Sequence, residues 1–203
     1  MLCLVVDRTA SRLPLMEAVT AAVAGGIDWI QLRDRNLGGA DWLEWAREVT
    51  EAVRAIRPEV EILVNRRLDV ALTLRAQGAH LGFDAVSPAT ARALLGKAAR
   101  IGASVHDLDE VAAAGERGLD YVHLAPVFDP VSKSRERPAL GADALRDARS
   151  QNIPIIAQGG IEPGRCREVL HAGARGIAVT GAILGSARPG DVTAALRAEL
   201  DSA

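Results

Sequence analysis

The stretch IIAQGG occupies residues 155–160, and a second stretch, GIAVTG, occupies residues 176–181. In each, a short apolar run typical of a buried strand leads through a glycine-bearing loop into a segment of helical composition. In a barrel of parallel strands, the loops after strands seven and eight form the usual phosphate site, because glycine lets backbone N–H groups approach the anion. The two stretches therefore predict a small phosphorylated ligand. The alternative is that the glycines only permit tight turns between strand and helix.

The same alternation of apolar runs and helical segments continues along the chain. Residues 15–24 and 41–56 are predicted helices, and Pro58 closes the second of them. Eight strands are expected, centred near Leu4, Ile30, Leu63, Leu81, Ile101, Val122, Ile155 and Ala178. Eight such units in 203 residues predict a single-domain (β/α)8 TIM barrel with short loops that spans residues 1–203. An open doubly wound sheet is the alternative, but the first βα turn lacks the G-x-G-x-x-G fingerprint.

Composition favours a small-molecule site in a soluble protein. The formal net charge is −2 and the 24 Lys and Arg residues are scattered, so neither a nucleic-acid surface nor a membrane-binding patch is indicated. Cys3 and Cys166 are far apart in sequence, which argues against disulfides or a structural zinc site and fits a reducing compartment. No apolar run is long enough for a signal sequence or a membrane span. We expect a cytoplasmic protein, with Trp42 and Trp45 in the core or at the contact of a possible homodimer.

Polar residues at the expected carboxyl ends of the strands are the candidates for a site, since barrel sites are assembled there. Basic side chains would give this pocket a positive potential that suits two anionic groups. They are Arg33, Arg35, Arg66 and Lys133. His106 and His123 are candidates for proton transfer, because imidazole titrates near neutrality. The alternative for His80 is a structural strand-end histidine, and the alternative for Asn65 is a cap of the following helix.

Carboxylates are scarce at the same ends of the strands. Asp34, Asp84 and Asp129 are the acidic residues expected there, and they form no obvious pair. Proteins hold Mg²⁺ through one or two carboxylates beside the phosphates of a substrate. The residues by themselves therefore predict no metal site.

Taken in order, these segments resemble the thiamin phosphate synthases and the related TenI-type thiazole tautomerases, which are small α/β barrels of thiamin biosynthesis. The resemblance covers nearly the whole chain and implies the same barrel fold. The matching segments are residues 31–35, 63–65 with 68–71, 78–82, 126–128 with 132–133, 159–161 and 176–179.

For a synthase, the resemblance implies a site of two parts. Thiazole phosphate would lie in the two glycine loops. Hydroxymethylpyrimidine pyrophosphate would lie opposite and lose its pyrophosphate with help from Mg²⁺ and basic residues. The first part would be held by Gly159, Gly160, Val179 and Thr180. The second part would be lined by Arg33, Arg35, Asn65, Ser104, Ser132 and Lys133.

This chain departs from the synthase pattern at the metal ligands. Synthases have Asn-Asp after strand three, where this chain has Asn65-Arg66, and the second metal aspartate is displaced to Asp84. Residues 33–35 and 104–106 resemble the tautomerase branch instead. The catalytic histidine of that branch corresponds to Pro126 here.

We therefore expect a metal-free TenI-type enzyme that binds thiazole phosphate carboxylate and moves a proton to form the aromatic tautomer. Its catalytic candidates are His106, His123 and Lys133. No cofactor is expected, and Mg²⁺ would be needed only for synthase activity. The alternatives are a thiamin phosphate synthase and a non-catalytic protein that binds a thiamin intermediate.

Overall fold

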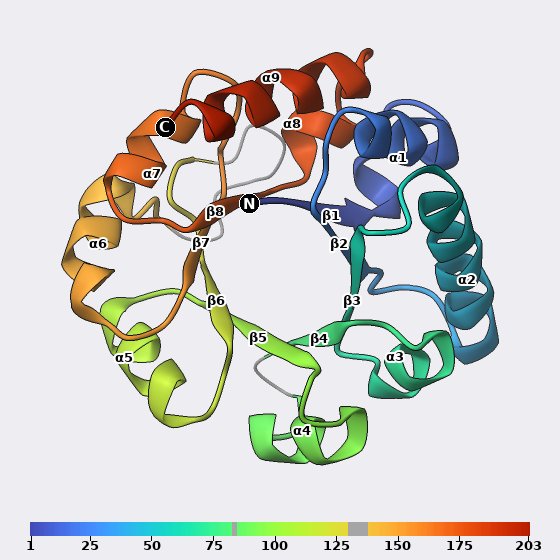
Figure 1. The fold of residues 1–203 in the computed structure, drawn as a ribbon, viewed down its shortest axis with the longest axis horizontal. Coiled ribbons are helices and arrows are strands. Elements are labelled where there is room, and N and C mark those ends of the chain that lie inside the picture. Colours follow the sequence, from blue (N-terminus) through green and yellow to red (C-terminus); the bar gives the residue numbers. More distant parts are fainter. Residues whose placement is uncertain (83–84, 130–137) are drawn as a thin grey trace.

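Eight parallel strands form a closed barrel in which β8 pairs with β1 (Figure 1). The computed structural model describes residues 1–82, 85–129 and 138–203. The strands are β1 (Leu2–Asp7), β2 (Trp29–Arg33), β3 (Glu61–Asn65), β4 (Gly78–Leu81), β5 (Arg100–Val105), β6 (Tyr121–Leu124), β7 (Ile155–Gln158) and β8 (Gly176–Val179). All eight predicted strand positions lie inside these strands. The TIM barrel is therefore confirmed and the open-sheet alternative is wrong.

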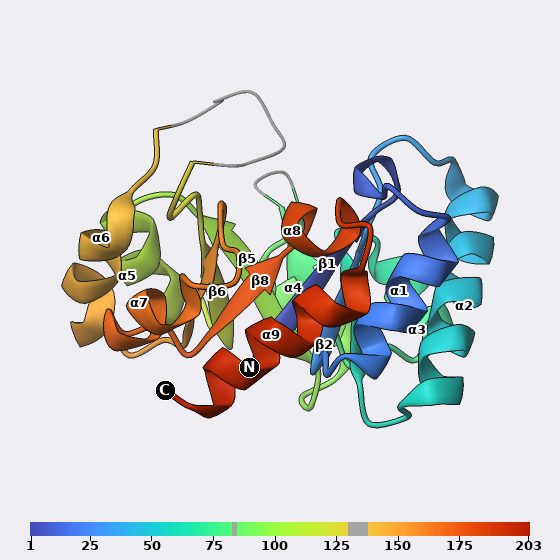
Figure 2. The ribbon, with the colours of Figure 1, turned by 90° about the horizontal axis from the view of Figure 1, so that it is seen from above.

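Helices surround the barrel on its outer face, and both chain ends lie toward the same end of it (Figure 2). They are α1 (Leu15–Ala24), α2 (Gly39–Ile56), α3 (Leu68–Leu74), α4 (Pro88–Leu95), α5 (Leu108–Glu116), α6 (Gly141–Asp147), α7 (Cys166–His171), α8 (Gly181–Leu184) and α9 (Pro189–Asp201). The helix predicted at residues 15–24 matches α1. The helix predicted at 41–56 begins two residues earlier, at Gly39. None of the described helices is long and apolar enough to cross a membrane.

The alternation of side chains along the strands places apolar residues on both faces of the sheet. In β1, Leu2, Leu4 and Val6 face outward and belong to the large core between the sheet and the helices. Cys3 and Val5 face inward and belong to a smaller core inside the barrel. The lower part of the barrel is therefore filled with side chains, as in other barrels of this type.

Trp42 and Trp45 lie in the outer core of the chain itself. They are 2% and 8% exposed, and their rings meet edge to face with centroids 5.2 Å apart. The indole N–H of Trp42 also donates to the carbonyl oxygen of Asp34, at 3.2 Å. The core alternative for these residues is confirmed, whereas the possible homodimer stays a prediction.

Gly102 provides the space for the ring of Tyr121 inside the barrel. A Cβ atom at this position would lie 2.1 Å from Cζ of Tyr121. The ring is 2% exposed and also packs edge to face on Trp29, with centroids 5.2 Å apart, so it has little freedom to move.

We expect Gly102→Ala to lower the free energy of unfolding by about 3 kcal/mol, because it overpacks the barrel interior. Urea unfolding of the two proteins measures this difference. Gly115→Ala is the matched control, since nothing lies within 4 Å of a Cβ at this helical position. That substitution should be neutral or should stabilise by about 0.5–1 kcal/mol. Equal stability of the Gly102 variant and the original protein would contradict the prediction.

Candidate functional site at the carboxyl ends of the strands

The strand pairings decide which inward-facing residues meet below the mouth of the barrel. Alternate strands contribute side chains to one level of a barrel interior. One level contains Gln31, His80 and His123, from β2, β4 and β6; we call these three residues the polar floor. The level above contains Asn65, Ser104 and Gln158, from β3, β5 and β7. These six side chains are polar, and they lie beside the inward-facing Val5 and Ala178 of the smaller core.

Arg33 is a fixed cation at the mouth. Its guanidinium forms an ion pair with Asp7, and the two side chains are 17% and 12% exposed. Asp7 also accepts hydrogen bonds from the backbone N–H and the hydroxyl of Thr9, at 3.1 and 2.7 Å. Burial, and then the charge of Arg35, lower the pKa of Arg33 from its ordinary value, but an arginine stays charged at neutral pH. Sequence reasoning missed Asp7, because a single acidic residue at the end of an apolar strand carries no pattern.

The segment 33–35 does not act as one unit. Arg33 faces the mouth, whereas Arg35 is exposed to solvent. Asp34 turns back to accept hydrogen bonds from the backbone N–H groups of Asn36 and Leu37, at 2.7 and 2.8 Å. One of the two arginines is therefore held at the site by the structure.

Asn65 is not a helix cap. Its side-chain amide donates to the carbonyl oxygen of His80, at 3.3 Å. The residue at the N-terminal cap of α3 is Arg67, and it makes no side-chain capping hydrogen bond. Arg66 follows Asn65 with a positive φ of 64° and is exposed. The capping alternative is therefore wrong, and Asn65 lies beside the polar floor.

His80 connects the polar floor to the mouth. Its Nδ1 lies 3.1 Å from the hydroxyl of Tyr121, and its Nε2 lies 2.9 Å from the hydroxyl of Ser104. Burial lowers the pKa of His80 well below its ordinary value, and the nearby His123 and Arg33 add to this effect. His80 is therefore a neutral hydrogen-bonding group inside the barrel.

His123 is fully buried and lies against His80, with ring centroids 4.4 Å apart. Its Nδ1 lies 3.2 Å from the side-chain oxygen of Gln158, so Nδ1 carries the hydrogen and Nε2 keeps a lone pair. Burial lowers the pKa of His123 to about 4. Such a weak base accepts a proton poorly at neutral pH, so the structure does not favour the proton-transfer role expected for His123.

Two buried acceptors of the polar floor lack a hydrogen-bond partner among the described residues. They are Nε2 of His123 and the side-chain oxygen of Gln31, which is 3% exposed. A buried polar atom without a partner costs free energy, which a bound donor group or water recovers. The floor therefore has two acceptors that a bound donor group can use.

The burial of these histidines makes the stability of the protein depend on pH. The unfolded chain binds a proton at His123 below pH 6.5, whereas the folded chain does so only near pH 4. Stability is therefore complete above pH 6.5 and falls as the pH decreases toward 4. Between pH 7.5 and pH 5, we expect the free energy of unfolding to fall by about 2 kcal/mol less in His123→Gln than in the original protein. Urea unfolding at the two pH values measures this difference. His171→Gln is the control, because His171 is exposed. The same pH dependence of stability in His123→Gln and the original protein would contradict the prediction.

His106 is better placed than His123 to exchange a proton with a ligand. It lies at the rim, partly exposed, and its Nδ1 lies 2.7 Å from the carbonyl oxygen of Ala125. Because a carbonyl only accepts, Nδ1 donates and Nε2 keeps its lone pair. The backbone N–H of His106 donates to Glu110 at 2.7 Å, and Asp107 caps α5. These contacts fix the ring in place.

The glycine loop after β7 lies against the chain that follows β6. Gly159 and Gly160 have φ values of 98° and 61°, and added Cβ atoms would lie 2.8 Å from Cα of Pro126 and 2.4 Å from the carbonyl oxygen of Asp129. Phe128 donates from its backbone to the carbonyl oxygen of Gly159, at 3.1 Å. Both positions require glycine because the chain after β6 passes so close to them. Whether these glycines also bind phosphate stays a prediction.

The loop after β8 lies at the mouth two strands away from Arg33, because β1 separates β8 from β2. Ala178 faces into the barrel, so Thr180, two residues later, lies on the same side. Its carbonyl oxygen begins α8 by accepting from Leu184, at 2.9 Å. Val179 is 3% exposed and belongs to the outer core, so it can contact a ligand only through its backbone. Ser132 and Lys133 lie outside the described residues.

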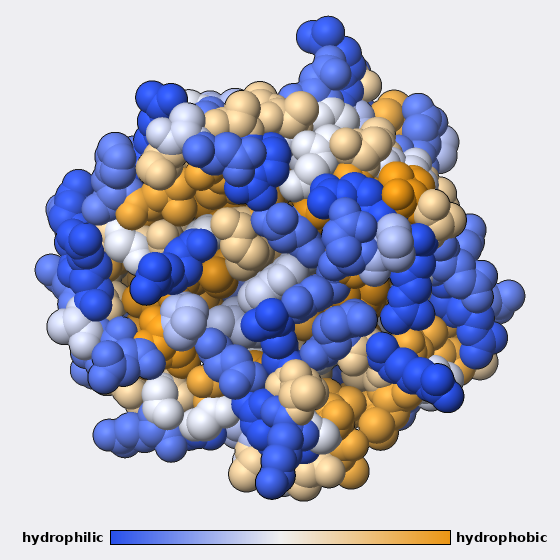
Figure 3. Space-filling model, viewed as in Figure 1, coloured by the Kyte–Doolittle hydropathy of each residue, from blue (hydrophilic) through white to orange (hydrophobic). Residues whose placement is uncertain are grey.

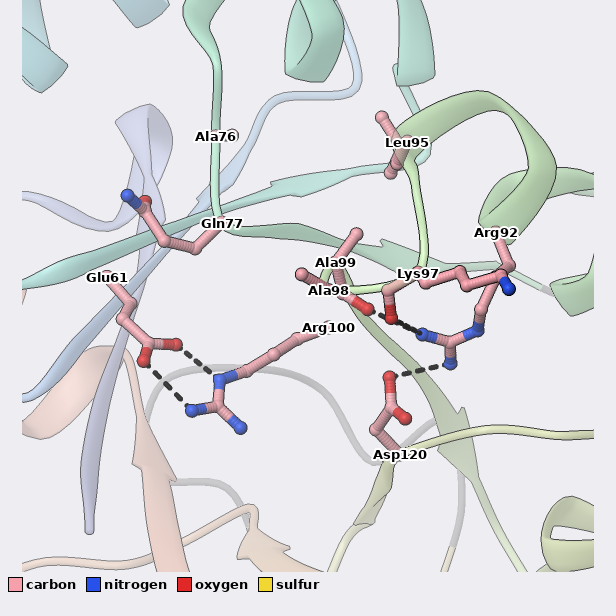
Figure 4. Close-up of a pocket in the computed structure, with 10 residues that line it drawn as sticks. All are labelled: Glu61, Ala76, Gln77, Arg92, Leu95, Lys97, Ala98, Ala99, Arg100 and Asp120. Atoms are coloured by element: carbon pink, nitrogen blue, oxygen red, sulfur yellow. Dashed lines mark hydrogen bonds and ion pairs between the residues drawn. The ribbon is translucent and has the colours of Figure 1, made fainter.

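A cavity of about 470 Å³ lies at the opposite end of the barrel, where the strands begin (Figure 4). Its two central arginines are paired: Arg92 lies 2.8 Å from Asp120, and Arg100 lies 2.5 Å from Glu61. Hydrophilic side chains cover the centre of this face (Figure 3). Both arginines are therefore neutralised within the protein.

The described residues do not fit a metal site. Nowhere in residues 1–82, 85–129 and 138–203 do three His, Cys, Asp or Glu side chains gather as metal ligands. Asp7 is held by Arg33, and Asp34 is held by backbone N–H groups. Asp84, the displaced carboxylate, lies outside the described residues.

The sequence profile of the thiamine monophosphate synthase family matches residues 2–183. The chain belongs to this family. It is 41% identical over 184 residues to the thiamine-phosphate synthase of Methanoculleus marisnigri, which covers 89% of this chain and 83% of that protein. With the thiamine-phosphate synthase of Syntrophomonas wolfei it shares 36% identity over 187 residues, covering 91% and 88%.

A solved structure agrees with this family assignment. The thiamine phosphate pyrophosphorylase from Pyrococcus furiosus superposes with a TM-score of 0.87 at 31% identity, covering 99% of this chain and 95% of that one. These findings confirm the predicted superfamily. The relatives are named as synthases, so the TenI-type branch expected from the sequence finds no support among them.

Proposed function

We propose that this family member is a thiamin phosphate synthase, which joins hydroxymethylpyrimidine pyrophosphate to thiazole phosphate and releases pyrophosphate. The observation that carries the proposal is a mouth with two separate regions that suit anions. Arg33, fixed by Asp7, lies at the end of β2, and the glycine loops after β8 and β7 lie two and three strands away around the barrel. Two separate regions for anions suit two phosphorylated substrates better than one.

The polar floor supports the same proposal. The pyrimidine substrate carries an exocyclic amino group with two hydrogens to donate, and the floor offers two buried acceptors, the oxygen of Gln31 and Nε2 of His123. Burial keeps both His80 and His123 neutral, so an uncharged ring can lie against them without electrostatic cost. In this arrangement the pyrimidine ring lies over the floor and its pyrophosphate extends toward Arg33.

The proposed reaction needs no proton carrier. The bond between the methylene carbon and the pyrophosphate oxygen breaks with its electron pair going to pyrophosphate, and the thiazole nitrogen then forms a bond to that carbon. Arg33 stabilises the charge that develops on the leaving group. A tautomerase, by contrast, must move a proton, and His123 is poorly suited to do so. His106 remains a candidate for that step, so group transfer is favoured by Arg33 and by the named relatives.

The proposal is tested by incubating the purified protein with both substrates and assaying thiamin phosphate and pyrophosphate together. We expect equal amounts of the two products, measured with Mg²⁺ and again with a chelator. A known synthase assayed in parallel shows that both substrates are competent to react. If no product forms in either condition while thiazole phosphate carboxylate is isomerised, the tautomerase is the correct function. Loss of that isomerisation in His106→Ala would then identify the proton carrier.

A further inference from the structure

Three side chains form a continuous chain of hydrogen bonds from the barrel interior to the mouth. Tyr121 lies below the polar floor and is 2% exposed, His80 is in the floor, and Ser104 is exposed at the mouth. The two contacts, of 3.1 and 2.9 Å, use opposite nitrogens of the His80 ring. A neutral imidazole has one donor and one acceptor nitrogen, so the two hydrogen bonds must run in the same direction along the chain.

The direction follows from what Tyr121 can do with its hydrogen. Burial raises the pKa of Tyr121 well above its ordinary value, so the phenol keeps its proton. Among the hydrogen bonds that the described residues make, Nδ1 of His80 is the single partner of this hydroxyl. If His80 donated to Tyr121, the buried phenolic hydrogen would have no acceptor there, which is costly. Tyr121 therefore donates to Nδ1, and Nε2–H donates to the oxygen of Ser104.

Ser104 consequently has its own hydrogen left for the mouth. The side-chain oxygen is occupied by the hydrogen from His80, so the hydroxyl can act as a donor to a ligand. Arg33 and Ser104 both lie at the carboxyl ends of their strands, β2 and β5, so both side chains belong to the same mouth. A pyrophosphate group, which has several anionic oxygens, can meet both of them there.

We propose that Tyr121 and His80 are positioning residues, which orient the Ser104 hydroxyl as a hydrogen-bond donor to an anionic oxygen of the pyrophosphate group. The inference rests on the proposed function for the identity of that group. It assigns an effect on ligand binding to a phenol that is buried below the polar floor and that acts only through His80 and Ser104.

The first test is Tyr121→Phe, which keeps the ring that packs on Trp29 and over Gly102 and removes only the hydroxyl. We expect the Kd for inorganic pyrophosphate, measured by calorimetry, to rise about three- to tenfold. In the Ser104→Ala background the same change should have no further effect, because the donor that it orients is gone. Additive losses in the double variant would overturn the proposal.

Two controls separate positioning from a structural effect. Thr50→Val removes another buried hydroxyl, on α2 and outside the barrel interior, and should leave pyrophosphate binding unchanged. The ¹⁵N spectrum of the His80 ring in the ligand-free protein reports the tautomer directly. We expect hydrogen on Nε2 in the original protein and a mixture in Tyr121→Phe. Hydrogen on Nδ1 in the original protein would overturn the proposal.

The failure of this inference is distinguishable from that of the proposed function. If no thiamin phosphate forms but pyrophosphate binds and the two variants remain coupled, the positioning chain holds and the synthase assignment is wrong. If thiamin phosphate forms but Tyr121→Phe binds pyrophosphate normally, the synthase assignment holds and the positioning chain is wrong. If pyrophosphate does not bind at all, the assigned ligand group is wrong.

Discussion

Thr180→Asp should raise the Kd for thiazole phosphate by about a hundredfold or more. Thr180 lies on the inward side at the end of β8, directly before α8, where the second glycine loop opens to the mouth. If thiazole phosphate binds in this loop as proposed, a carboxylate at this position lies close to the phosphate. Two unit charges about 4 Å apart repel by about 4 kcal/mol at an effective dielectric constant near 20, and the phosphate carries more than one charge. Calorimetric titration with thiazole phosphate measures the effect.

Thr180→Asn is the matched control, because asparagine has nearly the shape of aspartate and no charge. We expect it to weaken binding less than tenfold. Thr180 has a φ of −126°, so neither substitution places a side chain in the left-handed region. A change at Gly160 would not separate charge from shape, since any Cβ there meets the backbone of Asp129. Equal weakening by Asp and Asn would place the phosphate elsewhere.

Arg33→Gln should lower kcat/KM for the pyrimidine substrate by about 10²- to 10³-fold, which corresponds to about 3–4 kcal/mol of transition-state stabilisation. The guanidinium is held by Asp7 before any substrate binds, so little reorganisation is needed when charge develops on the leaving pyrophosphate. Most of the loss should appear in kcat, because the charge on the leaving oxygen is greatest in the transition state. Steady-state assays with saturating thiazole phosphate measure it.

Arg35→Gln serves as the comparison for this prediction. Arg35 is two residues away and carries the same charge, but it is exposed to solvent, where water and salt screen it. We expect a loss below tenfold that shrinks further at high salt. Unfolding of both variants must be measured in parallel, because Arg33 is mostly buried. A larger loss in Arg35→Gln than in Arg33→Gln would reverse the roles assigned to the two arginines.

Local sequence pattern was enough for the architecture. The apolar runs and the helical period placed all eight strands, and the helix at residues 15–24 has the predicted ends. These features depend on near neighbours in the chain, through side-chain alternation, helix period and glycine or proline at the ends. Sites of barrel proteins lie at the carboxyl ends of the strands. This rule predicted from chain position alone that Arg33, Asn65 and Ser104 lie at the same mouth.

Local pattern was not enough to distinguish roles among the polar residues. His106 and His123 had similar prospects in sequence, yet one is held at the rim by Ala125 and the other is fully buried with a pKa of about 4. The sequence also carried no sign of Asp7 as the partner of Arg33, because the two residues are 26 positions apart. The branch of the superfamily could not be decided by the departures at Arg66 and Pro126, and the relatives favour the synthase.

The sequence by itself therefore determined the barrel, the position of its mouth and the superfamily. The tertiary structure decided which polar side chains meet. Gln31, His80 and His123 share one level only because closure of the barrel brings three distant strands together. Burial and pKa depend on atoms contributed from all sides of that level, whereas sequence periodicity records only the side of the strand from which a residue projects.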